Sequence, residues 1–324
     1  MRARWCGRPP NTDMGTKSQL EVGGTVVDVS NLEKVFYPKT GFNKGQVIDY
    51  YVKVSPFLLP HLKARPITLK RYPNGVEGFF FYEKQCPPHP KWIKTTDVPR
   101  SDGSVIHYCV MDNLAALVWA ANLADLELHT FLHKAPAIAR PTALAFDLDP
   151  GPPADILLCC QVAVRLKEIF SKLKMQCFAK TSGSKGLQIF IPLNTPTTYA
   201  KTKAFAHTLA ESLERAMPEL VVSKMQKNLR GGKVLVDWSQ NDAHKTTVCV
   251  YSLRAKEHPT VSTPVSWEEV ETALKKKSAK SLVFETKDVF KRLDKHGDLF
   301  AAVLALKQTL PPIKTVIQAG QAIC

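Results

Sequence analysis

Residues 143–172 place the tightest constraint on the fold of this 324-residue chain. Residues 143–149 alternate in character as a β-strand does, and the turn sequence Pro-Gly-Pro-Pro at 150–153 ends the pattern. Residues 155–172 then carry apolar side chains at helical spacing. A strand, a tight turn and an amphipathic helix in succession predict a domain in which strands and helices are interleaved.

The remaining patterns extend this interleaving. Strands are predicted at 67–72, 79–83, 234–239 and 247–253, and a strand–turn–strand unit at 180–193. Residues 50–62 are predicted as the end of a helix, and further helices are predicted at 112–122 with Asp112 as N-cap, 200–216, 267–275 and 289–306. Short turns join several strands, which favours a mixed α+β fold over a doubly wound parallel sheet. The chain has neither a Walker A sequence nor G-x-G-x-x-G, so the usual nucleotide-binding folds are unsupported.

The net charge of the chain narrows the class of molecule that it binds. The formal net charge is +15, which indicates an anionic partner, most commonly a polyphosphate backbone. Charge alone does not separate DNA, RNA and a membrane surface, but no basic amphipathic helix of the membrane-binding type stands out. No apolar run long enough for a membrane span is present, and none follows the basic N-terminus. We therefore expect a cytoplasmic, nucleoid-associated protein without a membrane partner.

The eight cysteines lack the regular spacing of a disulfide framework. Reduced and mostly buried thiols are therefore expected. Cys86, His89, His107 and Cys109 are residue types that bind zinc, although their loop spacing is unusual for a zinc site. Zinc at these four residues stays open as a minor alternative.

Two aspartates on the predicted strand at 143–149 are the sharpest local signal. Alternate side chains of a strand share a face, so Asp147 and Asp149 point together while Leu144, Phe146 and Leu148 point into the core. Two carboxylates this close repel unless cations hold them, which favours divalent-metal binding. The alternative is a solvated strand end, with Asp149 starting the turn at Pro150.

A third aspartate strengthens the metal interpretation. Asp237 lies in the apolar strand sequence Val-Leu-Val-Asp-Trp-Ser at 234–239. A carboxylate within such a strand is unfavourable unless it is paired or metal-bound. Three aspartates on two strands are typical of two-metal nucleotidyl transfer, in which one ion activates the attacking 3′-hydroxyl and the other holds the triphosphate.

Basic and small residues flank these strands. The turn Thr-Ser-Gly-Ser-Lys-Gly at 181–186 brings backbone N–H groups, hydroxyls and the charge of Lys185 together, a combination suited to an anion. Arg230 and Arg254 add cations on either side of the Asp237 strand. A tight hairpin with solvated charges is the alternative for each.

Seven ordered motifs resemble the polymerase domain of bacterial ligase D, of the archaeo-eukaryotic primase superfamily. The motifs are Ser-Asn-Leu-Glu-Lys-Val-Phe-Tyr-Pro (30–38), Leu-Lys-Arg-Tyr-Pro-Asn-Gly (69–75), Leu-Glu-Leu-His (126–129), Phe-Asp-Leu-Asp-Pro (146–150), Thr-Ser-Gly-Ser-Lys-Gly-Leu (181–187), Val-Asp-Trp-Ser-Gln-Asn (236–241) and Tyr-Ser-Leu-Arg-Ala (251–255). The resemblance covers about residues 25–310. It implies a primase-polymerase α+β fold, with a central mixed or antiparallel sheet carrying the aspartates and a smaller N-terminal α/β portion.

The resemblance also implies roles for individual residues. Asp147, Asp149 and Asp237 resemble the catalytic, metal-binding triad for Mn²⁺ or Mg²⁺. Residues that resemble those holding the triphosphate and sugar of the nucleotide are Lys70, His129, Ser182, Lys185, Gln188, Arg230, Gln240 and Arg254. Those resembling a pocket for a DNA 5′-phosphate are Asn31, Lys34 and Lys44. Phe81 resembles the aromatic side chain that stacks on the template; since Phe79 shares its face of the predicted strand, one face of this strand is expected in the core.

Gln188 departs from the family pattern, which typically has histidine after Ser-Gly-Ser-Lys-Gly-Leu. Glutamine donates a hydrogen bond to a phosphate but supplies no charge. A weaker enzyme, an altered nucleotide preference or compensation by neighbouring cations are all open. On this basis Gln188→His is predicted to raise activity if the departure is unfavourable.

The expected function is templated addition of nucleotides, with ribonucleotides preferred, to primer ends at gaps or double-strand breaks in non-homologous end joining. The alternatives are a primase and a non-catalytic DNA-end-binding or synapsis module; a metal-dependent nuclease is also compatible with three aspartates. A DNA ligase and a Ku-type protein are expected as partners from the resemblance. The expected organisation is a disordered leader at 1–18, a DNA-end-binding portion at about 19–110, a catalytic portion at about 111–312 and a tail at 313–324.

Overall fold

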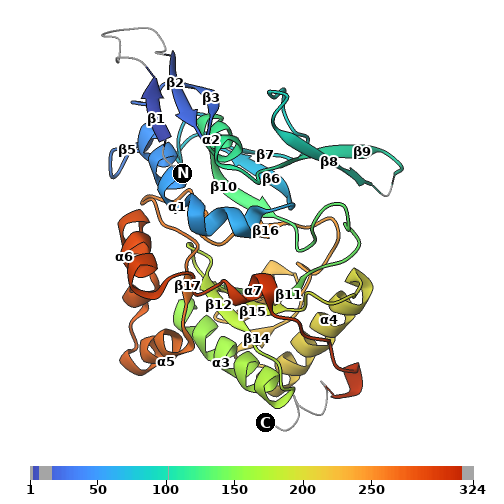
Figure 1. The fold of residues 1–324 in the computed structure, drawn as a ribbon. Helices are drawn as coiled ribbons and strands as arrows, with labels where there is room; N and C mark the ends of the chain where they lie inside the picture. The colour runs from blue at the N-terminus through green and yellow to red at the C-terminus, as the bar shows by residue number, and fades with distance from the viewer. Residues whose placement is uncertain (1–2, 7–16, 101, 316–324) are drawn as a thin grey trace. The chain divides into compact units, whose positions relative to one another are not determined.

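The computed structural model describes residues 3–6, 17–100 and 102–315 (Figure 1). The chain divides into two compact units, and each is described by itself. Unit 1 comprises Met1–Thr130 and Tyr251–Thr260; unit 2 comprises Phe131–Val250 and Val261–Cys324. Among the described helices none is both long and apolar enough to span a bilayer.

Unit 1 is built on antiparallel strands. Its largest sheet has the order β10-β6-β9-β8, and β7 also pairs with β6. These strands are β6 (Pro66–Arg71), β7 (Phe81–Glu83), β8 (Lys94–Pro99), β9 (Val105–Val110) and β10 (Asp125–Thr130). The smaller strands are β1 (Ala3–Cys6), β2 (Lys17–Val22) and β3 (Thr25–Ser30), which form one sheet, and β4 (Val35–Tyr37) and β5 (Phe42–Asn43), which form a hairpin.

Two helices complete unit 1. Helix α1 (Lys44–Leu62) begins at an Asn43–Gln46 capping box, in which each side chain bonds the other residue's backbone N–H. Helix α2 (Leu114–Asn122) packs against α1 and is apolar over nearly its whole length. Its N-cap is Asn113, whose side chain accepts from the Ala116 N–H at 2.9 Å. The prediction of Asp112 as the cap was wrong by one residue, because the Asp112 carboxylate pairs instead with Lys94 at 2.9 Å.

Unit 2 contains one mixed sheet of six strands in the order β14-β15-β11-β13-β12-β17. Only β14 and β15 run parallel. The strands are β11 (Ala143–Pro150), β12 (Phe178–Thr181), β13 (Leu187–Pro192), β14 (Val221–Val222), β15 (Val234–Asp237) and β17 (Pro264–Val265). The short strand β16 (Thr247–Val248) also belongs to this unit. The predicted α+β fold, with a mixed sheet carrying the three aspartates, is confirmed.

Helices α3 (Ile156–Lys172) and α4 (Tyr199–Ala216) cover one face of this sheet (Figure 1). Phe146 of β11 packs on Phe170 of α3, which in turn stacks on Phe205 of α4. The remaining helical elements of unit 2 are α5 (Trp267–Lys276), α6 (Thr286–His296), α7 (Ala302–Ala305) and the 3₁₀ turns η1 (Lys227–Leu229) and η2 (Ala279–Leu282). The face of β11 opposite Phe146 carries the aspartates.

Two predicted elements are shorter than expected. The strand predicted at 247–253 ends at Val248, because Tyr251 adopts a positive φ of 63° that a strand does not tolerate. The helix predicted at 289–306 is two helices, α6 and α7, because Gly297 has a φ of 63° and Asp298 caps the following turn through the Phe300 N–H.

The domain boundaries also differ from those expected. Unit 1 continues to Thr130 rather than about 110, because β10 pairs with β6 in the largest sheet. Unit 1 also includes residues 251–260. This segment is held by hydrogen bonds from the Tyr50 hydroxyl to the Tyr251 carbonyl at 2.8 Å and from the Leu128 N–H to the Ser252 hydroxyl at 2.9 Å. Part of the predicted disordered leader is ordered: β1 pairs with β2, which starts at Lys17. The rest of that leader, and the predicted tail beyond residue 315, lie outside the described residues.

Candidate active site

The three predicted aspartates share one face of the unit 2 sheet. Asp147 of β11 lies directly opposite Asp237 of β15 in the antiparallel ladder. Asp149 follows two residues after Asp147 and therefore points to the same face. The neighbouring Leu148 is fully buried on the helix-covered side. The strand alternation predicted from the sequence therefore places the three carboxylates on a common surface.

Asp237 is held by its own loop. Its Oδ1 accepts from the Ser239 N–H at 2.8 Å and the Ser239 hydroxyl at 2.6 Å, and its Oδ2 accepts from the Gln240 amide at 3.0 Å. Lys245 in turn donates to the Ser239 hydroxyl. The predicted residue Gln240 thus lies beside the triad, where it contacts a carboxylate.

One carboxylate oxygen of Asp147 is a buried hydrogen-bond acceptor without a donor. Its Oδ1 is buried and has no hydrogen-bond partner. Burial, followed by the charge of Asp149, raises the pKa of Asp147 to about 7, although the side chain of Gln188 and the charge of Lys180 act in the opposite direction. A buried carboxylate oxygen without a donor, beside two further carboxylates, fits a divalent cation.

A cation would have to draw these groups closer. Within residues 3–6, 17–100 and 102–315, no three His, Cys, Asp or Glu side chains already converge as a metal cage. Two of the Asp237 contacts come from the polar side chains of Ser239 and Gln240, which a metal ion would replace. The donor set is therefore chemically suited to a hard cation such as Mg²⁺ or Mn²⁺, and side-chain rotation would complete it.

The turn between β12 and β13 presents polar groups. The Ser182 hydroxyl oxygen accepts from the Ser184 and Gly186 N–H groups at 3.2 and 3.1 Å. A Cβ at Gly186 would lie 2.0 Å from the Leu148 carbonyl, so only glycine lets this turn pack against β11 beside the aspartates. Lys185 is exposed and has no ion pair in the part of the chain that the structure describes. Its ammonium is available to a ligand.

Arg230 is brought to the end of β11 by a close backbone approach. A Cβ at Gly151 would lie 1.9 Å from the Arg230 carbonyl, and the Gly151 N–H donates to the Lys233 carbonyl at 2.8 Å. The Arg230 guanidinium donates to the Met225 carbonyl at 2.5 Å, while its Nε is buried without a hydrogen-bond partner. Arg230 therefore keeps donors for an anion near Asp149.

Gln188 lies in the same row of the sheet as Asp147 and Asp237, and its side chain is hydrogen-bonded within the protein. It is opposite Asp147 on one side and opposite Lys180 on the other, and it is 3% exposed. Its Oε1 accepts from the Lys180 ammonium and its Nε2 donates to the Thr247 hydroxyl at 2.9 Å. The structure thus shows both ends of this amide bonded inside the sheet, where a free phosphate-contacting side chain was one expectation.

Unit 1 contains a second group of predicted residues, organised around Glu127. This carboxylate is 1% exposed. It pairs with Lys70 at 3.3 Å, His129 at 3.0 Å and Arg254 at 3.3 Å. It also accepts from the Tyr72 hydroxyl at 3.4 Å and the Ala255 N–H at 3.0 Å. Three predicted nucleotide-binding residues thus share one buried carboxylate, which we call the Glu127 cluster.

The electrostatics of this cluster favour an ionised Glu127. Burial opposes its charge, but the hydrogen bond from His129 and the charges of Arg254, His129 and Lys70 together hold the pKa of Glu127 well below its usual range. Burial lowers the pKa of His129 despite the neighbouring carboxylate. Sequence reasoning missed Glu127 because its role depends on partners far away in the chain, although it lies within the quoted motif at 126–129.

Four consecutive aromatic side chains lie at the surface of unit 1. Phe79, Phe80 and Tyr82 are 74%, 45% and 54% exposed, and Phe81 is half-buried. The expectation that one face of this strand enters the core is therefore wrong. Phe81 stacks on Phe79 with centroids 6.0 Å apart, and the Arg71 guanidinium lies over Phe81. Exposed aromatic rings beside cations are suited to stacking on nucleobases.

The three predicted 5′-phosphate residues are brought together at the start of α1. The Lys34 N–H donates to the Asn31 carbonyl at 3.0 Å, and the Lys44 N–H donates to the Lys34 carbonyl at 2.9 Å. Lys44 is the first residue of α1 and is buried. Burial and then the charge of Lys34 lower the pKa of Lys44 to about 8. A helix N-terminus with two lysines is suited to a phosphate.

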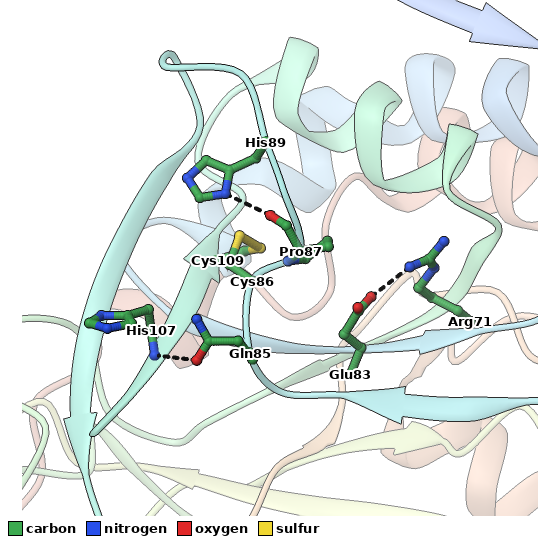
Figure 2. The surroundings of a disulfide bond; sticks show 8 residues. All are labelled: Arg71, Glu83, Gln85, Cys86, Pro87, His89, His107 and Cys109. Carbon is green, nitrogen blue, oxygen red and sulfur yellow. Dashed lines mark hydrogen bonds and ion pairs between the residues drawn. A yellow bond between two sulfur atoms is a disulfide. The ribbon is translucent and has the colours of Figure 1, made fainter. Parts of the chain in front are cut away.

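Two expectations are wrong for Cys86 and Cys109, namely that they are reduced thiols and that they could bind zinc. Cys86 and Cys109 form a disulfide with Cα atoms 5.0 Å apart (Figure 2). The two histidines bond elsewhere: His89 contacts the Pro87 carbonyl and His107 contacts Asp97. A backbone hydrogen bond from the Cys86 N–H to the His107 carbonyl, at 2.7 Å, holds the two segments side by side. The buried cysteines 159, 160, 177 and 249 form no disulfide, as expected.

The comparisons with known proteins decide the family. The model of the LigD primase-polymerase domain matches residues 43–300. This chain belongs to the LigD primase-polymerase family. The resemblance stated from the sequence motifs is therefore confirmed.

Relatives in three bacteria share this LigD domain. The chain is 38% identical over 278 residues to the multifunctional non-homologous end joining protein LigD of Mycolicibacterium smegmatis, covering 85% of this chain and 36% of that protein. It is 38% identical over 299 residues to LigD of Mycobacterium tuberculosis H37Rv, covering 88% and 37%. It is 33% identical over 270 residues to bifunctional LigD of Bacillus subtilis, covering 83% and 42%. The chain thus spans about two fifths of the length of these relatives.

A solved structure also supports the family assignment. The polymerase domain of Mycobacterium tuberculosis ligase D in complex with DNA matches with a TM-score of 0.79 and 36% identity. The match covers 87% of this chain and 99% of that one. At this level of similarity the LigD polymerase fold is shared by the two proteins.

Proposed function

We propose that this chain is a templated DNA-end polymerase that adds nucleotides to primer 3′ ends at gaps or double-strand breaks during non-homologous end joining. The observation that carries the proposal is the placement of Asp147, Asp149 and Asp237 on one face of the sheet, with the unpartnered Asp147 oxygen among them. The LigD family membership supports a nucleotidyltransferase in this setting.

The three aspartates would hold two divalent ions, Mn²⁺ or Mg²⁺. When bound, these ions would lower the pKa of the primer 3′-hydroxyl and neutralise charge on the triphosphate and the leaving pyrophosphate. The protein's own contribution is to hold the three carboxylates on one face of a strand pair, so that rotation of their side chains alone would complete the site. Ser239 and Gln240 hold the rotamer of Asp237 through hydrogen bonds, which a bound cation would replace.

Each unit carries its own candidate nucleotide-binding residues. Near the aspartates, Lys185 and Arg230 offer donors to an anion, and Ser182 offers a hydroxyl. In unit 1, Lys70, His129 and Arg254 are oriented by Glu127. Ribonucleotides are proposed as the preferred substrate, with His129 and Ser182 as the residues that sense the 2′-hydroxyl.

DNA-end recognition would use unit 1. Asn31, Lys34 and Lys44 at the start of α1 would bind the 5′-phosphate on the far side of a gap, because two lysines meet there at the positive end of the helix dipole. Phe81 would stack on the template. A DNA ligase and a Ku-type protein are proposed partners, given that the relatives are named end-joining proteins.

Extension of a labelled primer on a gapped duplex tests this function. The substrate carries either a 5′-phosphate or a 5′-hydroxyl downstream of the gap, and rNTP or dNTP is supplied with Mn²⁺. We expect templated extension that is faster with the phosphate and with rNTP. Tight, phosphate-dependent binding without extension would instead support the end-binding module, and chain initiation without a primer would support the primase.

A further inference from the structure

Lys180 is a buried lysine next to the proposed metal site. It is 1% exposed, on β12, and it lies opposite Gln188 in the ladder with β13. Its ammonium donates to the Val248 carbonyl at 3.0 Å, to the Ser262 hydroxyl at 2.7 Å and to the Gln188 Oε1. A charged side chain is rarely buried in this way unless its hydrogen bonds are made, so this environment is specific for an ammonium.

The ladder registers place four polar side chains in one row across the sheet. Asp237 is opposite Asp147, Asp147 is opposite Gln188, and Gln188 is opposite Lys180. Residues opposite one another in a ladder point to the same face. The row therefore runs from two proposed metal ligands, through one amide, to one ammonium.

The chemistry of the two ends sets the orientation of that amide. An ammonium has donors only, so the Gln188 atom that faces Lys180 must be the carbonyl oxygen. The amide nitrogen is then turned the other way, where one of its hydrogens bonds Thr247. The Gln188 side chain lies opposite Asp147 in the β11–β13 ladder and also hydrogen-bonds its carboxyl. An amide turned over would present oxygen to that carboxylate.

We propose that Lys180 is a positioning residue for the metal-binding carboxylate: by holding the Gln188 Oε1, it keeps the amide nitrogen directed at Asp147. Groups that hold a metal ligand in this way commonly change metal affinity by about 10–100-fold when they are removed. This inference rests on the proposed function, because Asp147 matters only if the three aspartates bind cations. It also gives Gln188 a role inside the sheet, in place of a contact with phosphate.

Mn²⁺ binding to the nucleotide-free protein tests the inference without any turnover. The concentration of free Mn²⁺ is read from its EPR signal during titration of the wild type, Lys180→Met, Gln188→Met and the double variant. Lys201→Met, an exposed lysine of α4 in the same unit, is the matched control. Circular dichroism establishes that each variant is folded, and Gln188→Met decides the matter if Lys180→Met does not fold.

We expect Lys180→Met and Gln188→Met each to raise the Mn²⁺ Kd about 10-fold. Because both residues act through one amide, the double variant should be no weaker than the singles. Tighter Mn²⁺ binding by Lys180→Met would mean that the ammonium merely repels cations, and it would overturn the proposal. So would an unchanged Kd in folded variants or fully additive losses.

The outcome also separates the two claims. If the wild type binds Mn²⁺ saturably and Asp149→Ala weakens that binding, the metal site stands whatever the Lys180 variants do. If the wild type shows no saturable binding that depends on Asp149, the metal site proposed under the function fails, and the positioning role of Lys180 fails with it.

Discussion

Asp147 lies directly opposite Asp237 in the β11–β15 ladder, so two carboxylates face each other on one side of the sheet. Like charges directly opposite in a ladder are destabilising. The arrangement persists because Asp147 is flanked on its other side by the amide of Gln188, and Asp237 is held by Ser239 and Gln240. Holding unfavourable charge in a fixed place is what the proposed cation site requires.

Asp149→Ala should abolish primer extension and leave DNA binding largely intact. The exposed Asp149 supports no part of the core, whereas the loss of one electrostatic group aimed at a transition state typically costs about 10²–10³-fold in rate. Extension rates and gel-shift affinities for the same gapped duplex give the two readouts. Weakened DNA binding together with an altered circular dichroism spectrum would point to a structural role instead.

Preference for a 5′-phosphate should fall as the pH rises from 7 to 9. The pKa of Lys44 is about 8, so its ammonium is present below that pH and is lost above it, whereas a phosphate monoester with a second pKa of about 6 stays doubly charged. The ratio of affinities for phosphorylated and unphosphorylated gaps is measured across this range. Lys44→Ala should remove both the preference and its pH dependence.

The matched control for Lys44 is Lys53→Ala, an exposed lysine of the same helix paired only with Asp49. It should retain the wild-type profile. A pH-independent phosphate preference in the wild type, or a preference that survives Lys44→Ala, would refute the pocket assigned to Asn31, Lys34 and Lys44.

Glu127→Gln should raise the KM for nucleotide about 10-fold or more, a magnitude usual when a supporting group is lost. Lys70, His129 and Arg254 would lose their common anchor. Leaving these cations without a counter-charge should also lower the free energy of unfolding by up to about 3–5 kcal/mol. Since the pKa of Glu127 is lowered in the folded state, this stabilisation is present at neutral pH and is lost as the solution is acidified.

Steady-state kinetics and urea unfolding check the Glu127 prediction. Glu77→Gln, at an exposed site of unit 1, is the matched control and should change neither quantity. An unaltered nucleotide KM in Glu127→Gln would contradict the role given to the cluster.

Phe81→Ala should weaken binding of a gapped duplex by about 1–3 kcal/mol, the value of one base stacked on one aromatic ring. Phe81→Trp should retain the affinity because it keeps a stacking surface. Fluorescence anisotropy with a labelled template measures both. Val105→Ala removes an exposed apolar side chain elsewhere in unit 1 and serves as the control. Equal affinities for wild type and Phe81→Ala would exclude the stacking role.

Peptide mapping under non-reducing conditions should find Cys86 linked to Cys109. Removing a disulfide typically costs about 2–4 kcal/mol, so Cys86→Ser with Cys109→Ser should lower the free energy of unfolding by an amount of that order. Zinc analysis of the purified protein should find no stoichiometric metal at these residues. Fully alkylated thiols at both positions in freshly isolated protein would contradict the disulfide.

Local patterns predicted the residues whose roles depend on neighbours in sequence. The alternation around Asp147 identified both its strand and its face, and Asp155 was correctly expected at the start of α3. The cap of α2 was misplaced by one residue because Asp112 and Asn113 are both good caps, and only the contact with Lys94 decides between them.

Residues whose roles depend on distant segments were not predictable. Glu127 forms an ion pair with Arg254, which lies more than a hundred residues later in the chain. Lys180 donates a hydrogen bond to Ser262, which is also distant in sequence. Cys86 and Cys109 are linked where a backbone hydrogen bond between Cys86 and His107 aligns their segments, which the sequence does not show. The 74% exposure of Phe79 was likewise not predictable, because its apolar character favours burial.

Pyrophosphate release during primer extension tests the central claim most directly, since a nuclease or an end-binding module releases none. The gapped duplex with a 5′-phosphate is incubated with rNTP and Mn²⁺, and released pyrophosphate is compared with nucleotides incorporated for the wild type and Asp147→Ala. We predict one pyrophosphate for each nucleotide added by the wild type and neither product from the variant. Extension that persists in folded Asp147→Ala, or a wild type that binds the duplex without releasing pyrophosphate, would contradict the assignment of catalysis to these aspartates.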